Sequence, residues 1–362
     1  MADAKVPPAK VARAVERARY HLGRLQQRTA PPQAVMLEMI LGAWISQAIT
    51  AAADLGIADA LAQGPLSADE LSARVDANPD TLRRLLRALS GRGIFRRRGD
   101  GRYELTSLAD TLRSDTEVSL AGMARFVGSP EHREHWSHLT EAVRTGEAAI
   151  PKLRGKQVFE YLADEPTLAA IFNDAMTSVS SFAIAPVVAA YDFTGFGTIV
   201  DVGGGHGRLL SAILTTTPGA RGVLYDLPQV VEGAPALLKQ FGVEERVRVV
   251  EGSFFESVPD GGDAYVLKNV IHDWADDDAV RILSAVRAAA RVGATLLLME
   301  LVIPQHDRDF VGNWIDLEML LGADARERTA AEYRRLYEKS GFVMTGVVET
   351  AAPFSVVEGR AI

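Results

Sequence analysis

The stretch TIVDVGGGHGRLL, Thr198–Leu210, joins a short apolar run to an acid, a set of alternating glycines and an apolar segment with helical spacing. This order predicts a buried strand, a tight turn and a helix whose free N-terminal N–H groups can hold a nucleotide. Asp201, Gly203 and Gly205 belong to the turn, and its glycines let a ligand approach bare backbone. A dinucleotide fingerprint would need a glycine where Arg208 stands, and no Gly-Lys-Ser/Thr of a triphosphate site is present. The pattern indicates a nucleotide without a pyrophosphate.

A second acid follows this turn at a distance typical of ribose recognition. Asp226, in VLYDLPQV, lies nineteen residues beyond Gly207 and ends the next expected strand. A carboxylate there can accept hydrogen bonds from both ribose hydroxyls, and it would repel a 2′-phosphate. Adenosine without a pyrophosphate, lying over a glycine loop, fits S-adenosylmethionine. The alternative is a glycine loop that is only a structural turn.

Length and composition describe an ordinary globular chain with a large core. Its 362 residues exceed one usual domain, 48% of them are hydrophobic and 24% are charged. The net charge of −8 argues against a nucleic-acid or membrane partner. The absence of cysteine excludes disulfides, thiolate metal sites and cysteine nucleophiles. We see no signal peptide and no run of 18 uncharged apolar residues, and we therefore expect a cytoplasmic protein.

The N-terminal part predicts helices and a small winged module. Apolar residues between Val35 and Ala62 have helical spacing and cover more than one face, which indicates burial against a partner subunit. Ser67 with Glu70 forms a capping-box pattern, and Asn78-Pro79 opens a second helix. IFRRRGDGRYEL then predicts a two-stranded hairpin. Helix, helix and hairpin indicate a winged helix-turn-helix.

This module is rich in arginine. Residues 83–102 contain eight arginines and one acid, so DNA binding has to be considered. The alternative is a solvated face of a protein–protein module. The acidic total charge and the catalytic character of the remaining chain favour this alternative.

The rest of the chain predicts a helical connector followed by a doubly wound α/β domain. Residues 116–185 are expected to be helical, and strands and helices alternate after Pro186, which predicts a parallel sheet. We expect domains at 1–115, 116–185 and 186–362. The expected strands are Thr198–Val202, Gly222–Asp226, Val247–Glu251, Ala264–Leu267, Thr295–Leu301 and Val343–Glu349.

Three residues could carry acid–base chemistry near the carboxyl ends of these strands, where such sheets bind ligands. His272, in LKNVIHDW, could take a proton from a hydroxyl. Glu300 follows an apolar strand, and Glu327 precedes the last helix, so either acid could orient the imidazole. The structural alternatives are that His272 and Asp273 only cap a helix, that Glu300 forms a buried salt bridge and that Glu327 caps the helix beginning near Thr329.

A second set of histidines lies in EHREHWSHL. His132, His135 and His138 recur at a spacing of three, which could place them on one helix face around a metal. No carboxylate pattern completes such a site, and packing around Trp136 is the preferred interpretation.

Taken in order, these motifs resemble a known family. DVGGGHG, YDLPQV, EGSFFESVP, LKNVIHDW, Glu300 and the RERT stretch are similar to the small-molecule O-methyltransferases that use S-adenosylmethionine. The family includes plant caffeate and flavonoid enzymes, hydroxyneurosporene enzymes and bacterial polyketide-tailoring enzymes. The resemblance extends from the helices near Val35 to Phe342. It implies a Rossmann-like methyltransferase domain and a winged helix that forms a homodimer, in which each N-terminal part helps to close the partner's active site.

The resemblance also implies roles in cofactor binding. Gly203 and its neighbours would meet the methionine end of S-adenosylmethionine, and Asp226 would meet the ribose. Ser253 and Phe254 would flank the adenine, with Lys268 close by. The plant enzymes have Gly-Asp-Met where this chain has Gly-Ser-Phe, so a neutral hydroxyl would replace a carboxylate at the adenine.

The same resemblance implies a base and an acceptor pocket. His272 matches the general base, and Glu300 and Glu327 match the two acids beside it. Ala323 stands where the family has an amide that recognises the acceptor. The positions that match the lining of the acceptor pocket are Phe172, Met176 and Met319.

These expectations combine into a mechanism without a metal. His272 would take the proton of a phenolic hydroxyl on a small-molecule acceptor while the methyl group leaves the sulfonium. Two alternatives stay open. The first is a relative of the same fold that methylates carbon or nitrogen, or that transfers no methyl group. The second is a winged-helix regulator that senses a metabolite.

Overall fold

The computed structural model describes residues 6–116, 118–323 and 325–362, and they divide into two compact units. The sheet unit comprises the chain up to His21, Thr140–Gln157 and Ala183–Ile362. The helical unit comprises Leu22–Leu139 and Val158–Phe182. The domain boundaries expected at residues 115 and 185 stay predictions. Three helices contribute residues to both units: α1 (Ala9–Gln27), α10 (Leu139–Thr145) and α13 (Pro166–Ala190).

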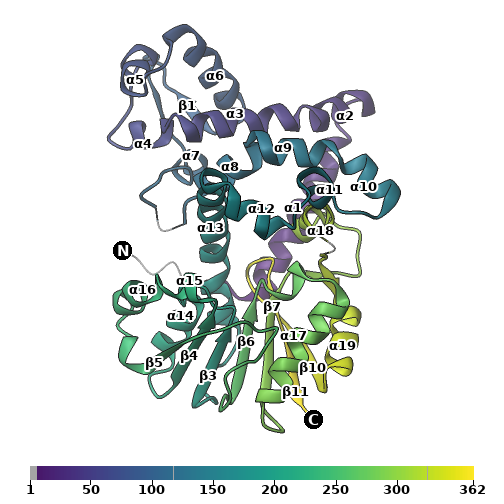
Figure 1. The fold of residues 1–362 in the computed structure, drawn as a ribbon. Helices are drawn as coiled ribbons and strands as arrows, with labels where there is room; N and C mark the ends of the chain where they lie inside the picture. Colours follow the sequence, from purple (N-terminus) through teal and green to yellow (C-terminus); the bar gives the residue numbers. More distant parts are fainter. Residues whose placement is uncertain (1–5, 117, 324) are drawn as a thin grey trace. The chain divides into compact units, whose positions relative to one another are not determined.

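A seven-stranded sheet forms the centre of the sheet unit (Figure 1), in the order β10-β11-β7-β6-β3-β4-β5. Six of the strands confirm the predicted strands to within one residue at each end. The strands are β3 (Thr198–Val202), β4 (Arg221–Asp226), β5 (Val247–Glu251), β6 (Ala264–Lys268), β7 (Thr295–Glu300), β10 (Phe342–Glu349) and β11 (Ser355–Ala361).

The sheet is mixed, so the prediction of a parallel sheet is wrong at one edge. Strands β3 to β7 pair in parallel, but β11 runs antiparallel to both β7 and β10. The chain turns tightly between β10 and β11, where the Thr350 hydroxyl accepts from Ala352 N (3.0 Å) and donates to Phe354 O (2.7 Å). So short a connection can join only antiparallel strands. The sequence analysis expected no strand after Glu349 and missed this hairpin.

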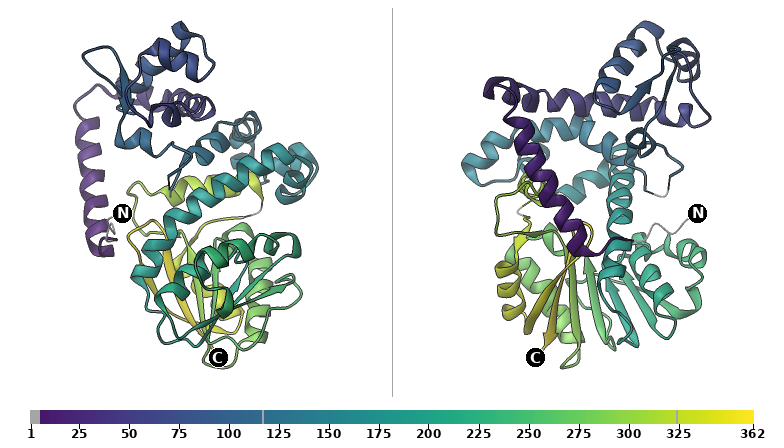
Figure 2. Two further views of the ribbon diagram at one scale, coloured as in Figure 1. Left: turned by 90° about the vertical axis from the view of Figure 1, so that its left-hand side faces the viewer. Right: turned by 180° about the vertical axis from the view of Figure 1, so that it is seen from behind.

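Helices cover both faces of the sheet (Figure 2). Val200 packs in one core with Ile282 and Leu336, whereas a Cβ on Gly222 would lie 2.8 Å from Leu210 on the opposite side. The predicted doubly wound arrangement is therefore confirmed. These helices are α14 (Arg208–Thr216), α15 (Pro228–Val231), α16 (Ala234–Gln240), α17 (Asp276–Ala289) and α19 (Ala330–Lys339). The remaining elements of the unit are α11 (Ala149–Arg154), η1 (Glu244–Arg246), η2 (Ile271–Asp273), β8 (Val302–Ile303), α18 (Val311–Gly322) and β9 (Arg328–Thr329).

The helical unit contains the predicted order of helix, helix and hairpin (Figure 1). Ser67 and Glu70 form the expected capping box, and Asn78 accepts from the backbone N–H groups of Asp80 and Thr81. The hairpin pairs β1 with β2 in antiparallel register. The elements are α2 (Pro32–Ile40), α3 (Gly42–Asp54), α4 (Ile57–Leu61), α5 (Ala68–Arg74), α6 (Pro79–Gly91), β1 (Phe95–Arg97), β2 (Tyr103–Leu105), α7 (Ser107–Asp110), α8 (Ala121–Gly128), α9 (Pro130–Ser137) and α12 (Val158–Asp164).

Four of the eight arginines in residues 83–102 are paired with carboxylates of the same module. Asp69 pairs with Arg83, and Glu104 pairs with Arg96 and with Arg98. Arg102 lies 3.6 Å from Glu70. This pairing reduces the positive field that a phosphate backbone would meet, and it favours the interpretation of the arginines as a solvated protein face.

Two helical segments expose apolar side chains. By length and composition alone, Pro32–Asp54 and Pro166–Ala190 could each span a membrane. The first is interrupted at Leu41, between α2 and α3. The second runs through Pro186, so that the expected change to alternating strands begins only at β3. On α2 and α3 the exposed side chains are Met36, Leu37, Met39, Ile40 and Trp44.

Candidate active site

The turn after β3 strongly favours glycine at three positions. Gly203, Gly205 and Gly207 have φ angles of +68°, +60° and +82°, a region that side-chain-bearing residues rarely adopt. A Cβ on Gly203 would also lie 2.9 Å from Cγ2 of Val270. Helix α14 begins directly after Gly207. The predicted glycine turn is therefore present, with a helix N-terminus behind it.

Two acids stand at this turn, as predicted. Asp226 ends β4, and its carboxylate accepts from Gly205 N (2.8 Å) and from Leu227 N (2.7 Å), which fixes it beside the glycines. Asp201 is fully buried, and this burial raises its pKa to about 7, although the charge of Lys268 acts in the opposite direction. Its Oδ2 has no hydrogen-bond partner among the described residues.

An aromatic cluster links the loop after β5 to the segment after β6. Phe254 and Phe255 stand edge-on to Trp274. Their ring centroids lie 6.1 and 4.7 Å, respectively, from that of Trp274. Phe254 also lies against Gly203, because a Cβ there would be 3.6 Å from its ring. The Ser253 hydroxyl accepts from Phe255 N at 3.3 Å. Of the predicted adenine-flanking residues, Phe254 therefore adjoins the glycine turn, and Trp274 is an addition that the sequence analysis did not single out.

Buried polar groups gather at this edge of the sheet, and several of their oxygens have no partner among the described residues. Lys268 ends β6, and burial lowers its pKa against the charges of Asp201 and Glu300. Asn269 follows with φ +53°, and its Oδ1 is buried without a partner among the described residues. The same holds for one carboxylate oxygen of Glu300 and one of Glu327. A ligand that offers a cation and several donor groups fits this set of oxygens.

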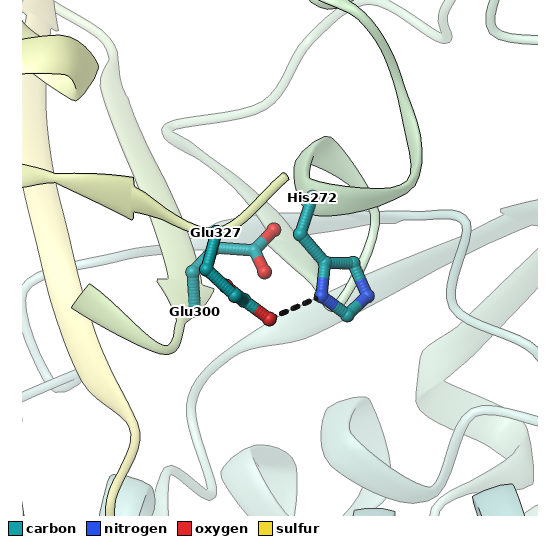
Figure 3. A group of neighbouring side chains, drawn as sticks. All are labelled: His272, Glu300 and Glu327. Carbon is teal, nitrogen blue, oxygen red and sulfur yellow. Dashed lines mark hydrogen bonds and ion pairs between the residues drawn. The ribbon is translucent and has the colours of Figure 1, made fainter. Parts of the chain in front are cut away.

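His272 and Glu327 form a hydrogen-bonded pair (Figure 3). The imidazole Nδ1 lies 2.8 Å from Glu327 Oε1. The backbone N–H of Glu327 donates to Asp316 Oδ1 at 2.8 Å. Glu327 does not cap α19, because Thr329 and Glu332 form the capping box there. Of the two acids that could contact the imidazole, Glu327 makes the hydrogen bond.

Glu300 holds the turn on which His272 stands. It ends β7 fully buried, and its Oε1 accepts from Val270 N (3.2 Å) and Ile271 N (2.9 Å). It therefore fixes the backbone directly before the histidine, and within the part of the chain that the structure describes it forms no buried salt bridge. In Figure 3 its carboxylate faces the imidazole without touching it. Burial raises the pKa of Glu300 to about 7.

Negative charges surround the imidazole. Asp273 Oδ1 lies 3.3 Å from His272 Nε2, on the side opposite to Glu327. Burial alone lowers the pKa of His272, but the nearby carboxylates outweigh this effect and raise that pKa to about 10. These carboxylates are Asp273, Glu300 and Glu327. The sequence analysis treated Asp273 only as a helix cap, and its position next to His272 was the available signal.

The same three side chains could hold a metal ion by distance alone. His272, Glu300 and Glu327 offer ligand atoms within 4.8 Å of one another. However, Nδ1 is already bonded to Glu327, and Oε1 of Glu300 already accepts two N–H groups. This arrangement suits an oriented imidazole, and the expectation of no metal stays a prediction.

The histidines of α9 are part of the packing of the helical unit. His132 and His135 are buried, and each ring stands edge-on to an aromatic ring, that of Phe126 and that of Tyr161 respectively. His138 is the C-cap residue of the helix. Within the described ranges, no group of three metal-ligating side chains includes any of these histidines.

The expected acceptor-lining residues stand on two helices. Phe172 and Met176 are one turn apart on α13, and Phe172 packs edge-on against Phe126 with centroids 5.4 Å apart. Met319 stands on α18. Their common contact with an acceptor stays a prediction. A cavity of about 290 Å³ lies at the C-terminal end of α18. It is lined by Gly146, Ala275, Asp276, Leu320, Ala323, Ala325 and Arg326.

Comparisons with known proteins agree with this geometry. The O-methyltransferase domain model matches residues 136–343, and the O-methyltransferase dimerisation domain model matches residues 37–115. Phenazine O-methyltransferase PhzM of Lysobacter antibioticus is 40% identical over 92% of this chain and 97% of its own length. The 8-amino-8-demethylriboflavin N,N-dimethyltransferase of Streptomyces davaonensis is 35% identical over 86% of this chain and 90% of its own.

A solved structure is similar over nearly the same length. It is an O-methyltransferase from neocarzinostatin biosynthesis in complex with S-adenosylmethionine and 2-hydroxy-5-methyl naphthoic acid. The TM-score is 0.73 at 34% identity, over 88% of this chain and 96% of that one. The domain match covers more than half of the chain. The chain therefore belongs to the O-methyltransferase family, and it is an S-adenosylmethionine-dependent O-methyltransferase of secondary metabolism.

Proposed function

We propose that this enzyme methylates a phenolic hydroxyl of a small aromatic metabolite and that His272 takes the hydroxyl proton. The hydrogen bond between His272 Nδ1 and Glu327 carries the proposal. A carboxylate at Nδ1 keeps the proton on that nitrogen, so Nε2, which faces Asp273, is the nitrogen that would take the hydroxyl proton. Glu300 supports this arrangement because it holds the backbone before His272.

Seven residues would hold the cofactor. S-adenosylmethionine supplies a methyl group on a positively charged sulfonium when it is bound. The fixed carboxylate of Asp226 keeps lone pairs for ribose hydroxyls, and the ring of Phe254 offers an apolar face to a base. The unpartnered Asp201 Oδ2 offers an acceptor to a charged amine. The residues proposed are Asp201, Gly203, Gly205, Asp226, Ser253, Phe254 and Lys268.

The raised pKa of His272 suits a phenol. An ordinary phenol loses its proton near pH 10, so an imidazole of pKa 6.5 would accept that proton uphill. The surrounding carboxylates raise the pKa of His272 to about 10, which reduces the free energy needed for this proton transfer. The consequence is that the imidazole is mostly protonated at pH 7. We therefore expect turnover to rise with pH well above neutrality.

We propose the class of acceptor from the names of two relatives and from residue 323, where this chain differs from the family pattern. The neocarzinostatin enzyme is solved with a hydroxynaphthoic acid, and another relative is named 3-amino-4-hydroxybenzoate 4-O-methyltransferase. Flat hydroxylated aromatic acids are therefore the first acceptors to test. Ala323 supplies no side-chain amide, so recognition by an amide at this position is not expected.

The test is methyl transfer from labelled S-adenosylmethionine to a panel of phenols, quinones and polyketides. We expect label on a hydroxyl oxygen of at least one phenolic acceptor, located by mass spectrometry and NMR of the product. Binding of the cofactor with no methyl transfer to any phenol, or label on carbon alone, would overturn the proposal.

N-methylation is a second candidate because one relative is named an N,N-dimethyltransferase. A neutral arylamine already has a nucleophilic lone pair and needs no base before it attacks. A pair of acceptors that differ only in hydroxyl against amino separates the two candidates. If the amine is methylated at the same rate by the parent enzyme and by His272→Ala, while the phenol is not methylated, nitrogen is the acceptor atom.

We infer that the enzyme acts as a homodimer through its N-terminal helices. The dimerisation model matches residues 37–115, which include most of the exposed apolar side chains of α2 and α3. Burial of such a patch between subunits is favourable, and it accounts for these helices without a membrane. Sedimentation of Trp44→Glu, with Val292→Glu as an equally exposed control, should show dissociation of the first variant only. The cysteine-free composition also suits a cytoplasmic location.

A further inference from the structure

Arg328 is a charged side chain that is completely buried beside the base site. It follows Glu327 directly and opens β9, and none of its surface is exposed. A buried guanidinium is costly unless its donors are paired. The hydrogen-bond partners of Arg328 must therefore offset the cost of burying its charge.

The guanidinium of Arg328 binds the turn that carries the base. Its Nη1 donates to Ile271 O (2.9 Å) and its Nη2 to Trp274 O (2.7 Å). Nε and Nη2 both donate to Asp276 Oδ1, at 3.0 and 2.8 Å. The two carbonyls are those of the residue before His272 and of the residue two places after it. One side chain thus spans the turn on both sides of the histidine.

A backbone bond ties the same two segments together. Arg326 N donates to His272 O at 3.0 Å. On its other side, Arg328 pairs in register with Val302, which follows Glu300 by two residues. The segments that carry His272, Glu300 and Glu327 are therefore tied together at residue 328. Because the guanidinium is planar and its donors diverge at fixed angles, its bonds fix direction as well as distance.

We propose that Arg328 is a positioning residue that sets the geometry between His272 and Glu327. Its fork fixes the turn around His272 against the backbone that carries Glu327, so that Nδ1 stays within hydrogen-bond distance of Oε1. A shift of less than 1 Å would break that 2.8 Å bond. The consequence for turnover rests on the proposed role of His272 as base.

The competing explanation is that Arg328 only stabilises the fold. A suitable control is Arg246, a partly buried arginine at the opposite edge of the sheet, before β5. It donates to the carbonyls of Leu214, Thr217, Pro218 and Ala220, at 2.9 to 3.3 Å. Both side chains hold several backbone carbonyls, but only Arg328 holds those of the base turn. Replacing either arginine by lysine keeps the charge and removes the fork.

The experiment compares Arg328→Lys with Arg246→Lys in the full-length enzyme labelled with ¹⁵N-histidine. The resonance of His272 is assigned as the one missing in His272→Gln. In the parent we expect a low-field Nδ1 proton and a titration midpoint far above 6.5. In Arg328→Lys we expect this proton signal to be lost, the midpoint to fall by at least one pH unit, and kcat to drop about tenfold with KM for S-adenosylmethionine unchanged.

Each outcome decides between the two explanations. In Arg246→Lys we expect a lower melting temperature with the His272 signals and kcat of the parent, which supports the proposal. If Arg328→Lys lowers only the melting temperature in the same way, the proposal is overturned. If Arg328→Lys does not fold, Asp276→Ala, at the half-exposed partner of Arg328, must shift the His272 signals in the same direction, and no shift overturns the proposal. Turnover that survives in His272→Ala would refute the base role, whereas the NMR signals would still test the positioning role.

Discussion

The glycine turn after β3 is held by backbone conformation, whereas the base site after β6 is held by buried charge. The turn lies within a few consecutive residues, and its positive φ angles are a local property of Gly203, Gly205 and Gly207. The base site takes its side chains from three segments, and its imidazole and carboxylates sit in a region of low dielectric constant. Both regions lie at the carboxyl edge of one sheet, yet backbone conformation maintains one and electrostatic interactions maintain the other.

This difference means that the two regions can be perturbed separately. A change in the turn alters the space and backbone N–H groups offered to the cofactor, and its effect should appear in cofactor affinity. A change in the base site alters a proton affinity, and its effect should appear in turnover and in its pH dependence. The comparison fails if either kind of change produces both effects.

The largest effect is expected from His272→Ala. Without Nε2 no side chain takes the hydroxyl proton, so kcat with a phenolic acceptor should fall about 10²- to 10⁴-fold. Calorimetry should give an affinity for S-adenosylhomocysteine within twofold of the parent. His306→Ala, a change of an exposed histidine, is the matched control and should retain full activity. Equal turnover in the two variants would show that His272 is not the base.

A smaller loss of turnover is expected from Glu327→Gln. The amide keeps the shape but removes the charge that stabilises the protonated imidazole, and its NH₂ group can turn the ring to the wrong tautomer. We expect kcat to fall about 10²-fold, with the KM for the cofactor unchanged. Glu332→Gln keeps the capping box of α19 and serves as control. A parent-like rate in Glu327→Gln would show that the hydrogen bond to Nδ1 does not contribute to turnover.

The contrast between the regions also explains what the sequence could predict. The glycine turn, Asp226 and six of the strands were predictable because local pattern determines them. The antiparallel β11 was missed because its buried positions after Val357 are Gly359 and Ala361, and these small residues are poor strand formers. The resemblance pointed to His272, Glu300 and Glu327, but not to how they divide their tasks.

That division depends on distances between side chains in the folded protein. The spacing of these residues along the sequence does not determine those distances. Glu327 is 55 residues from His272 and bonds its ring, whereas Glu300 is 28 residues away and bonds the backbone before it. The burial of Arg328, within RERT, is not predictable from the sequence, because arginine is almost always exposed unless partners far along the chain pair it. Asp273 was visible as a neighbour of the histidine, but only the structure places its carboxylate 3.3 Å from Nε2.

A moderate decrease, confined to the affinity for the cofactor, is expected from Gly203→Ala. The left-handed backbone there costs a side-chain-bearing residue about 1–2 kcal/mol, and the new Cβ would also press on Val270. We expect the affinity for S-adenosylmethionine to fall about tenfold or more, measured by calorimetry. The pH profile of kcat should stay in place. Gly219→Ala is the control, because its Cβ would meet no atom within 4 Å. A shifted pH profile in Gly203→Ala would show that the two regions are coupled.

The smallest and most specific effect is expected from Asp273→Asn. The catalytic imidazole must be neutral, so turnover should rise with pH towards the pKa of His272, which the carboxylates raise to about 10. Removing the charge of Asp273 disfavours the imidazolium and lowers that pKa. The rising limb of the pH–rate profile should therefore move towards lower pH, by about one unit. Asp278→Asn makes the same chemical change at an exposed ion pair in the first turn of α17 and should leave the limb in place.

The direction of this shift separates electrostatic control from a direct role in catalysis. If Asp273 only raises the proton affinity of His272, the variant loses rate at high pH, where its imidazole is a weaker base, and loses less at pH 7, where more of the imidazole is neutral. A role as the base itself would instead lower the rate by the same factor at every pH and leave the limb in place. An equal shift in Asp278→Asn would assign the effect to net charge. If the limb moves in Asp273→Asn alone and cofactor affinity stays constant, the base site sets the proton affinity of His272. The glycine turn then has no part in setting it.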